Sequence, residues 1–345
     1  MSRAYRLILG SALILALLVV SLGAYVRLSD AGLGCPDWPG CYGQLVGVPE
    51  QVHEVNAAQS AFPGKPVEAH KAWKEMIHRY AASVLGLCIA ALAAMAWRQR
   101  AHRAPWLEVA LLAVVAGQGL LGMLTVTRLL KPVIVTSHLL GGMSTLGLLV
   151  VLFLRERRPA RLPNAAPGLR MLALAALLTV FVQIALGGWV SSNYAAAICA
   201  DFPTCQGSWW PAMDTHHAFT LDRELGATAS GALLPGAALT AIHWTHRLFA
   251  GVVLIVVGSF GLGLLGPGGR RGYGMAVLAA LAVQITLGIA NVLLQWPLLL
   301  AVAHNTGAAL LLCVTLAATA RVFIGRTAPG SMRRAEFPRR FEIVR

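Results

Sequence analysis

Charged residues are scarce in this sequence. Only 12% of its 345 residues are charged and only 14 are acidic, whereas 57% are hydrophobic and the mean hydropathy is +0.68. This composition excludes an ordinary soluble domain and indicates a membrane protein. No small-residue cleavage site precedes Arg27 at the end of the first apolar run, so we expect that run to be a retained helix rather than a cleaved signal peptide.

Basic residues outnumber acidic ones, and the formal net charge is +14. Such an excess often indicates nucleic-acid binding, but most of the Lys and Arg fall in loops and tails on one side of the apolar runs if the N-terminus is inside the cell. This is the positive-inside pattern of membrane proteins. We therefore expect no nucleic-acid partner and place both termini in the cytoplasm.

Eight uncharged runs have the length needed to span a membrane, about 20 residues for roughly 30 Å of hydrocarbon. The apolar stretch between Arg271 and Arg321 is too long for one helix, so we divide it at 295–297. The predicted fold class is an all-α integral membrane protein with eight transmembrane helices. The predicted spans are 7–27, 77–97, 107–127, 132–154, 169–190, 241–264, 273–294 and 298–320.

The two halves of the chain resemble each other. The heptapeptide from Cys35 to Cys41 recurs, with two cysteines, an aspartate and a proline in the same places, from Cys199 to Cys205. Because an even number of spans separates the copies, both have the same orientation in the membrane. The sequence thus predicts two tandem pseudo-symmetric four-helix bundles, with domains at 1–160 and 161–325 and a basic, mobile cytoplasmic tail at 326–345.

The connections outside the membrane alternate between long and short. The segments 28–75 and 191–240 are long and rich in proline, glycine and polar residues, so we expect irregular structure with short helices there. The connections at 128–131 and 295–297 have almost no residues to spare.

Four histidines lie near the outer ends of predicted spans, at positions equivalent between the two halves: His78, His138, His246 and His304. An ionisable side chain at membrane depth costs about 2.5 to 3.5 kcal/mol on insertion scales, so four matched ones need a reason. One explanation is hydrogen bonding between helices. The other is ligation of heme iron, because two neutral imidazoles on facing helices of a bundle suit a heme. Zinc fits less well, since it requires three or four ligands at one point.

Arginines and one carboxylate accompany these histidines. Arg79 and Arg247 each follow a histidine directly and could pair with heme propionates or extend to lipid headgroups. Glu75 lies one helical turn before His78, where the second half has His243. A carboxylate there could move a proton or stabilise positive charge, or it could be an exposed interfacial glutamate.

Four of the six cysteines form the two repeated pairs Cys35/Cys41 and Cys199/Cys205. On the outer side of a bacterial membrane each pair can close a small disulfide ring, worth about 2 to 2.5 kcal/mol by loop entropy. Each ring could be a structural clip, and the first pair could instead be redox-active. Cys88 and Cys313 lie inside spans, where we expect them to pack as small apolar residues.

Together these motifs resemble the heme A synthases of bacteria and mitochondria, over the chain from Leu22 to about Arg321. The stretches that carry the resemblance are Gly23 to Arg27 with Gly32 and the first cysteine pair, Glu75 to Arg79, Ser137-His138, Gly187 to Val190, His243 to Arg247, and His304-Asn305.

The resemblance implies an oxidoreductase that converts the C8 methyl of heme O to the formyl group of heme A, through successive hydroxylations, for cytochrome c oxidase. It implies a heme b cofactor held by His246 and His304, and a heme O substrate between His78 and His138 with Glu75 as the catalytic residue. It further implies the bacterial cytoplasmic (inner) membrane with the histidines toward the periplasm. The expected partners are the lipid bilayer, heme O synthase, an electron-transfer protein and a second copy of the chain.

Two other functions fit the same four histidines. A di-heme b-type cytochrome for quinol electron transfer would hold two permanent hemes and would not require Glu75. A heme transporter would leave the heme chemically unchanged.

Overall fold

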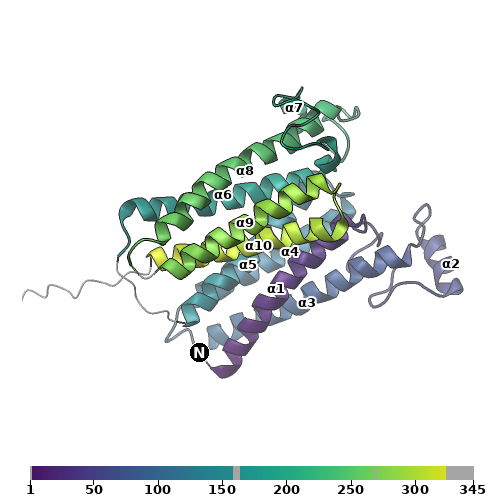
Figure 1. The fold of residues 1–345 in the computed structure, drawn as a ribbon. Helices are drawn as coiled ribbons and strands as arrows, with labels where there is room; N and C mark the ends of the chain where they lie inside the picture. Colours follow the sequence, from purple (N-terminus) through teal and green to yellow (C-terminus); the bar gives the residue numbers. More distant parts are fainter. Residues whose placement is uncertain (1, 158–163, 269, 324–345) are drawn as a thin grey trace, which may run out of the picture.

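The computed structural model describes residues 2–157, 164–268 and 270–323 (Figure 1). This part of the chain is helical, and eight of its helices are long and apolar enough to cross a membrane, which confirms the predicted fold class. They are α1 (Arg3–Leu28), α3 (Ala69–Arg98), α4 (Trp106–Thr127), α5 (Pro132–Arg157), α6 (Pro167–Ser192), α8 (Gly236–Leu264), α9 (Arg271–Leu293) and α10 (Leu298–Phe323). The predicted tail 326–345 lies outside the described residues.

Among the helices that begin earlier than their predicted spans, two do so by five residues or more. α3 starts at Ala69 and α8 at Gly236, ahead of the predicted starts at 77 and 241. The first turns of α3 carry Lys71 and Lys74, which are too polar for the hydrocarbon region. Hydropathy marks where the membrane ends, whereas a helix continues as long as its backbone hydrogen bonds are made. Consequently His78 and His246 lie deeper within their helices than predicted.

The long helices lie side by side, and their contacts follow the same order in both halves (Figure 1). α3 and α5 each contact α1 and α4, and α8 and α10 each contact α6 and α9. The halves meet where α1 contacts α10 and where α5 contacts both α6 and α10. Two four-helix units would make these contacts, and the boundaries at 1–160 and 161–325 stay a prediction.

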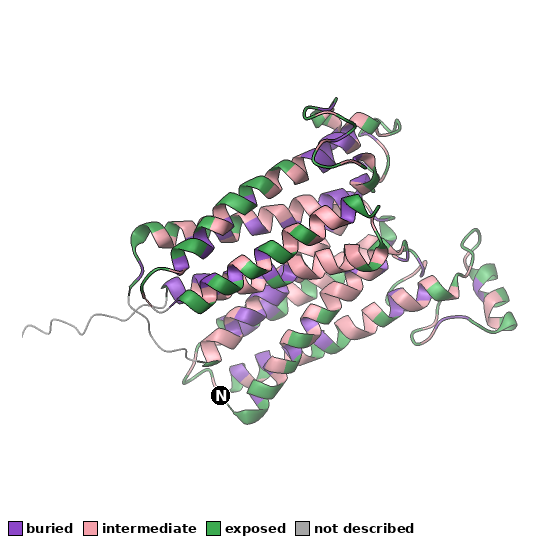
Figure 2. Ribbon diagram, in the orientation of Figure 1, coloured by how far each residue is buried: buried purple, intermediate pink, exposed green. Residues whose placement is uncertain are grey.

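Large apolar side chains point both inward and outward. A buried core that includes Leu9, Leu146 and Phe260 joins the helices, while Leu7 and Ile255 are among many exposed apolar residues. Figure 2 shows exposed residues along the outward faces of α8 and α9. Exposed leucine and isoleucine over the length of a helix suit contact with lipid tails. Cys88 and Cys313 pack against this core as free cysteines, which agrees with the packing interpretation.

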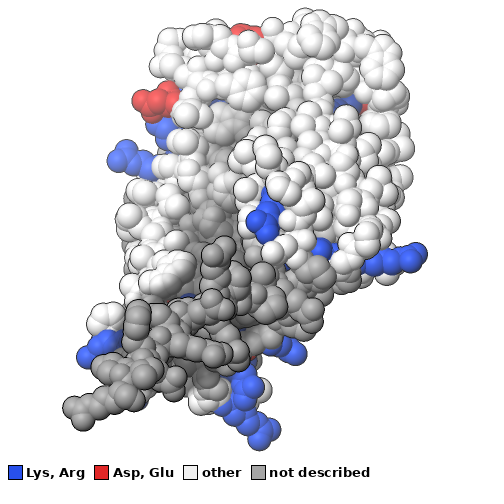
Figure 3. All heavy atoms as spheres, turned by 90° about the vertical axis from the view of Figure 1, so that its left-hand side faces the viewer, with Lys and Arg blue, Asp and Glu red and all other residues white. Residues whose placement is uncertain are grey.

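The two long connections lie at one end of the helices, opposite the N-terminus (Figure 1). As predicted, they contain short helices within irregular structure: α2 (Val52–Ala61) in the first, and η1 (Ala195–Ile198) and α7 (Thr215–Ala218) in the second. The other two outer connections are as short as predicted, since α5 begins at Pro132 and α10 at Leu298. Figure 3 looks onto the N-terminal end, where basic side chains predominate among the visible charges.

Candidate functional site

The four predicted histidines lie on helices that are diagonal within each half. His78 is on α3 and His138 on α5, and both of these helices flank α1 and α4 without being major neighbours of each other. His246 on α8 and His304 on α10 have the same relationship to α6 and α9. The structure therefore places the two histidines of each half on opposite helices of that half.

Each histidine ring lies against a glycine of a neighbouring helix. A Cβ atom added to the glycine would come within 3.0 to 3.6 Å of the Cε1 atom of the ring, closer than ordinary van der Waals contact at three of the four sites. At those three sites only glycine leaves room for the ring in its present position. The pairs are Gly23 with His78, Gly122 with His138, Gly187 with His246, and Gly288 with His304.

Sequence reasoning missed these glycines as site residues. Three of the four have a glutamine one turn earlier on the same helix face, in the pattern Gln-x-x-x-Gly at 118–122, 183–187 and 284–288. In the fourth, Val19 precedes Gly23. The repeated spacing was a visible signal, but only the folded chain shows that it faces the histidines.

The ring nitrogens differ between the halves. Nδ1 of His78 and Nδ1 of His138 are buried without a hydrogen-bond partner. In the second half, Nε2 of Gln183 lies 3.2 Å from Nδ1 of His246, and Nε2 of Gln284 lies 3.3 Å from Nδ1 of His304. The alternative explanation for the buried histidines, a hydrogen bond between helices, therefore fits His246 and His304 better than His78 and His138.

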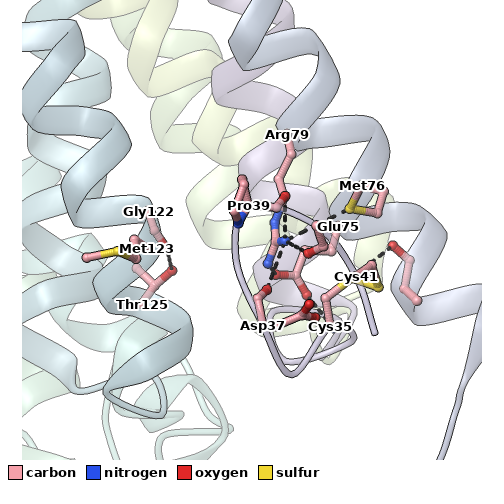
Figure 4. A network of polar contacts seen from close by, with 12 residues as sticks. Cys35, Asp37, Pro39, Cys41, Glu75, Met76, Arg79, Gly122, Met123 and Thr125 are labelled. Carbon is pink, nitrogen blue, oxygen red and sulfur yellow. Dashed lines mark hydrogen bonds and ion pairs between the residues drawn. A yellow bond between two sulfur atoms is a disulfide. The ribbon is translucent and has the colours of Figure 1, made fainter. Parts of the chain in front are cut away.

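Glu75 is buried beneath the first cysteine pair, and only 4% of its surface is exposed. Its Oε2 accepts a hydrogen bond from the backbone nitrogen of Cys35 at 3.0 Å, and its Oε1 pairs with Nη2 of Arg79 at 2.5 Å (Figure 4). The alternative of an exposed interfacial glutamate is therefore wrong. These two partners fix the carboxylate close to His78 on the same helix.

Arg79 points into the loop of the first cysteine pair (Figure 4). Its Nη1 donates to the backbone carbonyls of Asp37 at 3.1 Å and Pro39 at 3.2 Å, and also to that of Gly40. These partners are protein atoms, so the guanidinium does not extend to lipid headgroups. Pairing of Arg79 with a heme propionate stays a prediction. In this structure the Nη1 atom of Arg79 already donates to carbonyl oxygens of the loop.

Arg247 holds the second loop in the same way. Its guanidinium donates to the carbonyls of Cys199 at 2.6 Å, Asp201 at 2.7 Å and Thr204 at 2.9 Å. Its Nε lies 3.2 Å from Nε2 of His243, which is buried where the first half has Glu75. The halves thus share an arginine beneath each loop, but only the first combines it with an acidic side chain.

Both predicted disulfides are present, Cys35–Cys41 and Cys199–Cys205, and all four cysteines are fully buried. An aspartate within each ring closes the turn that follows the ring. Asp37 accepts from the backbone nitrogens of Tyr42 and Gly43, and Asp201 accepts from those of Gln206 and Gly207. The hydroxyl of Thr204 and these amides lower the pKa of Asp201 to about 2. The two predicted disulfides are therefore confirmed, whereas the choice between a structural clip and a redox role for Cys35 and Cys41 stays a prediction.

The comparisons with known proteins cover almost the whole chain. A family model described as "Cytochrome oxidase assembly protein" matches residues 6–316. The "Heme A synthase" of Shewanella oneidensis is 42% identical over 304 residues, covering 87% of this chain and 91% of that protein. The "Heme A synthase" of Caulobacter vibrioides is 30% identical over 339 residues, covering 90% and 93%, and that of Shouchella clausii is 28% identical over 292 residues, covering 81% and 88%. The chain therefore belongs to the family of cytochrome oxidase assembly proteins.

Proposed function

We propose that this protein is a heme A synthase, an oxidoreductase that converts the C8 methyl group of heme O to the formyl group of heme A. The net change is R–CH₃ + H₂O → R–CHO + 4 H⁺ + 4 e⁻, so the reaction requires an acceptor for four electrons, for which we propose an electron-transfer partner. The proposal is supported by relatives of that name that match nearly the full length. It is also supported by the two histidine pairs and by Glu75, which is buried on the helix that carries His78.

The second half fits a resident heme b. His246 and His304 offer two imidazoles across the bundle, and Gly187 and Gly288 leave room for their rings. Neutral imidazole is a usual axial ligand of heme iron. When bound, heme b supplies one-electron transfer. The protein contributes the two ring nitrogens and the apolar surroundings.

The first half fits the heme substrate. His78 and His138 are arranged like the second pair, but this half alone has Glu75 beside its arginine. A carboxylate there stabilises positive charge that develops as the methyl group is oxidised, or accepts a proton released from it. The observation that carries the assignment is this asymmetry, because the buried counterpart of Glu75 is His243.

The surroundings of the two sites suggest how the protein lies in the cell. The exposed apolar faces of the helices fit a bilayer, and the basic N-terminal end fits the cytoplasmic side of the inner membrane. This orientation places the disulfide loops and histidine sites toward the periplasm, where disulfides form. Heme O synthase would supply the substrate, and self-association of the chain is compatible with the exposed faces.

The test is to express the chain in a bacterium whose own heme A synthase is deleted, to purify it, and to identify its extracted hemes by mass. We expect heme b together with heme O or heme A, and restored heme A in the membranes. Two hemes b per chain without heme A formation would instead favour a di-heme cytochrome. Unchanged heme O that exchanges from both halves would favour a transporter.

A further inference from the structure

In the second half, His246 and His304 each lie against a glutamine and a glycine of a neighbouring helix. The amide nitrogen of Gln183 is 3.2 Å from Nδ1 and 3.4 Å from Nε2 of His246. The amide nitrogen of Gln284 is 3.3 Å from Nδ1 and 3.4 Å from Nε2 of His304. Gly187 and Gly288, one turn further along, contact the Cε1 side of the same rings. Each ring is thus confined by an amide and by a glycine backbone.

The first half lacks this arrangement. Val19 occupies the position of Gln183, so no amide can reach His78 from there. Gln118 occupies the position of Gln284 and lies over Gly141 as Gln284 lies over the equivalent Gly307, but no hydrogen bond joins its amide to His138. Nδ1 of His78 and Nδ1 of His138 accordingly have no hydrogen-bond partner. The two sites therefore have similar glycines but different polar neighbours.

The side-chain amides are what only the second half places at its rings. The Oε1 atoms of Gln183 and Gln284 are buried and have no hydrogen-bond partner.

A histidine that binds iron through one ring nitrogen has to donate the N–H of the other, and the acceptor fixes the ring and makes it a better ligand. Rotating the terminal amide group of Gln284 by half a turn exchanges the positions of its oxygen and nitrogen. Oε1, which has no partner now, then lies within reach of Nδ1–H of His304. The rotation is easy because this torsion angle of glutamine has a broad energy minimum. For Gln183 the turn has to be accompanied by a shift of the side chain toward Nδ1, because Oε1 would otherwise face the backbone carbonyl oxygen of His246, to which Nε2 now donates.

We propose that Gln183 and Gln284 are positioning residues that hold His246 and His304 as heme ligands, and that their absence from the first-half rings leaves that site exchangeable. The inference rests on the proposed function, because it takes the second half as the heme b site. A cofactor has to stay bound through many turnovers, whereas heme O has to enter and heme A has to leave. The same fold can hold a permanent heme in one half and an exchangeable heme in the other if the hydrogen-bond acceptors of the histidine ligands differ.

The test replaces Gln183 and Gln284 together by methionine, which keeps the length of the side chain but has no amide. The purified holoprotein is mixed with excess apomyoglobin, and the transfer of heme b is followed by absorbance. Loss of such a partner typically costs about 10- to 100-fold in affinity, so we expect heme b to leave faster by about that factor. The midpoint potential of the heme b should also rise, because an imidazole without an acceptor donates less charge to the iron.

Three further variants separate positioning from packing. The matched control Gln118→Met alters the equivalent glutamine of the first half and should leave heme b transfer unchanged. Gln284→Glu keeps acceptor oxygens, so it should retain heme b and lower its potential, in the opposite direction from methionine. Val19→Gln gives the first half the missing amide and should slow the loss of heme from that half.

Wild-type transfer rates and potentials in the double methionine variant would overturn the inference. The same shift of potential in Gln284→Glu and Gln284→Met would also overturn it, because it would indicate packing alone. Failure of the proposed function looks different: the heme b spectrum of the wild type would survive the loss of His246 and His304, whatever the glutamine variants do.

Discussion

The carboxylate of Glu75 accepts a hydrogen bond at 3.0 Å from the backbone nitrogen of Cys35, 40 residues earlier in the chain. This contact joins the helix that carries His78 to the first disulfide ring. Arg79 completes the connection, since it pairs with Glu75 and donates to carbonyls of the same ring. The acidic residue proposed for catalysis is therefore held in place by the loop above it.

Replacing Glu75 should affect the chemistry more than heme binding. Glu75→Gln keeps the shape but removes the charge, so we expect heme A formation to fall by about 10² to 10⁴, the range for a positioned acid or base. Heme retention should change much less, because the histidines are untouched. The measurement is heme A formed per heme O supplied, with the bound-heme spectrum, in wild type, Glu75→Gln and Glu75→Asp. Near-normal heme A production by the Gln variant would leave Glu75 as a tether of the loop.

The second pair of histidines should be required for the stable heme b spectrum. We expect His246→Ala or His304→Ala to remove that spectrum while the protein still inserts into the membrane, because each variant loses one of two axial ligands. His216→Ala, on an exposed residue of α7, is the control and should retain the spectrum. The assignment does not survive if a variant of both His246 and His304 keeps a six-coordinate b-type spectrum.

The glycine beside His246 should be needed for the position of the ring. In Gly187→Ala the new methyl group would lie 3.1 Å from Cε1 of His246, so the ring has to move and we expect less heme b per chain. Gly251→Ala, on α8, is a matched control because its added Cβ meets nothing within 4 Å. Heme content and absorbance of the purified variants provide the measurement, and equal heme content in both would contradict the expectation.

The two disulfides should differ in their effect on activity. Cys35→Ser and Cys199→Ser each open one ring, so both should lower the melting temperature, in line with a loss of about 2 to 2.5 kcal/mol. We expect Cys35→Ser to reduce heme A formation more, since the backbone of Cys35 holds Glu75. Melting temperature and activity are measured on the same preparations. Full activity of Cys35→Ser at a normal protein level would exclude a redox role, and the disulfide would then have a structural role only.

Much of the site could be predicted from particular residues. The matched positions of the four histidines and of the two cysteine pairs were visible as a repeat, and the substitution of His243 for Glu75 was visible in the same comparison. The burial of Glu75 was not predictable, because it depends on a loop that folds back over α3. The acceptors of Arg79 were hidden for the same reason, since they are backbone carbonyls of that loop.

The sequence by itself determined the eight helices, because a bilayer leaves each apolar run no other way to satisfy its backbone hydrogen bonds. It also determined which residues recur between the halves, since a repeat is a property of order along the chain. Only the tertiary structure decided that the amide of Gln284 reaches the ring of His304 whereas Gln118 leaves Nδ1 of His138 without a partner. Those two glutamines occupy equivalent places in the sequence, and their contacts depend on the rotation and spacing of neighbouring helices, which many packed side chains set together.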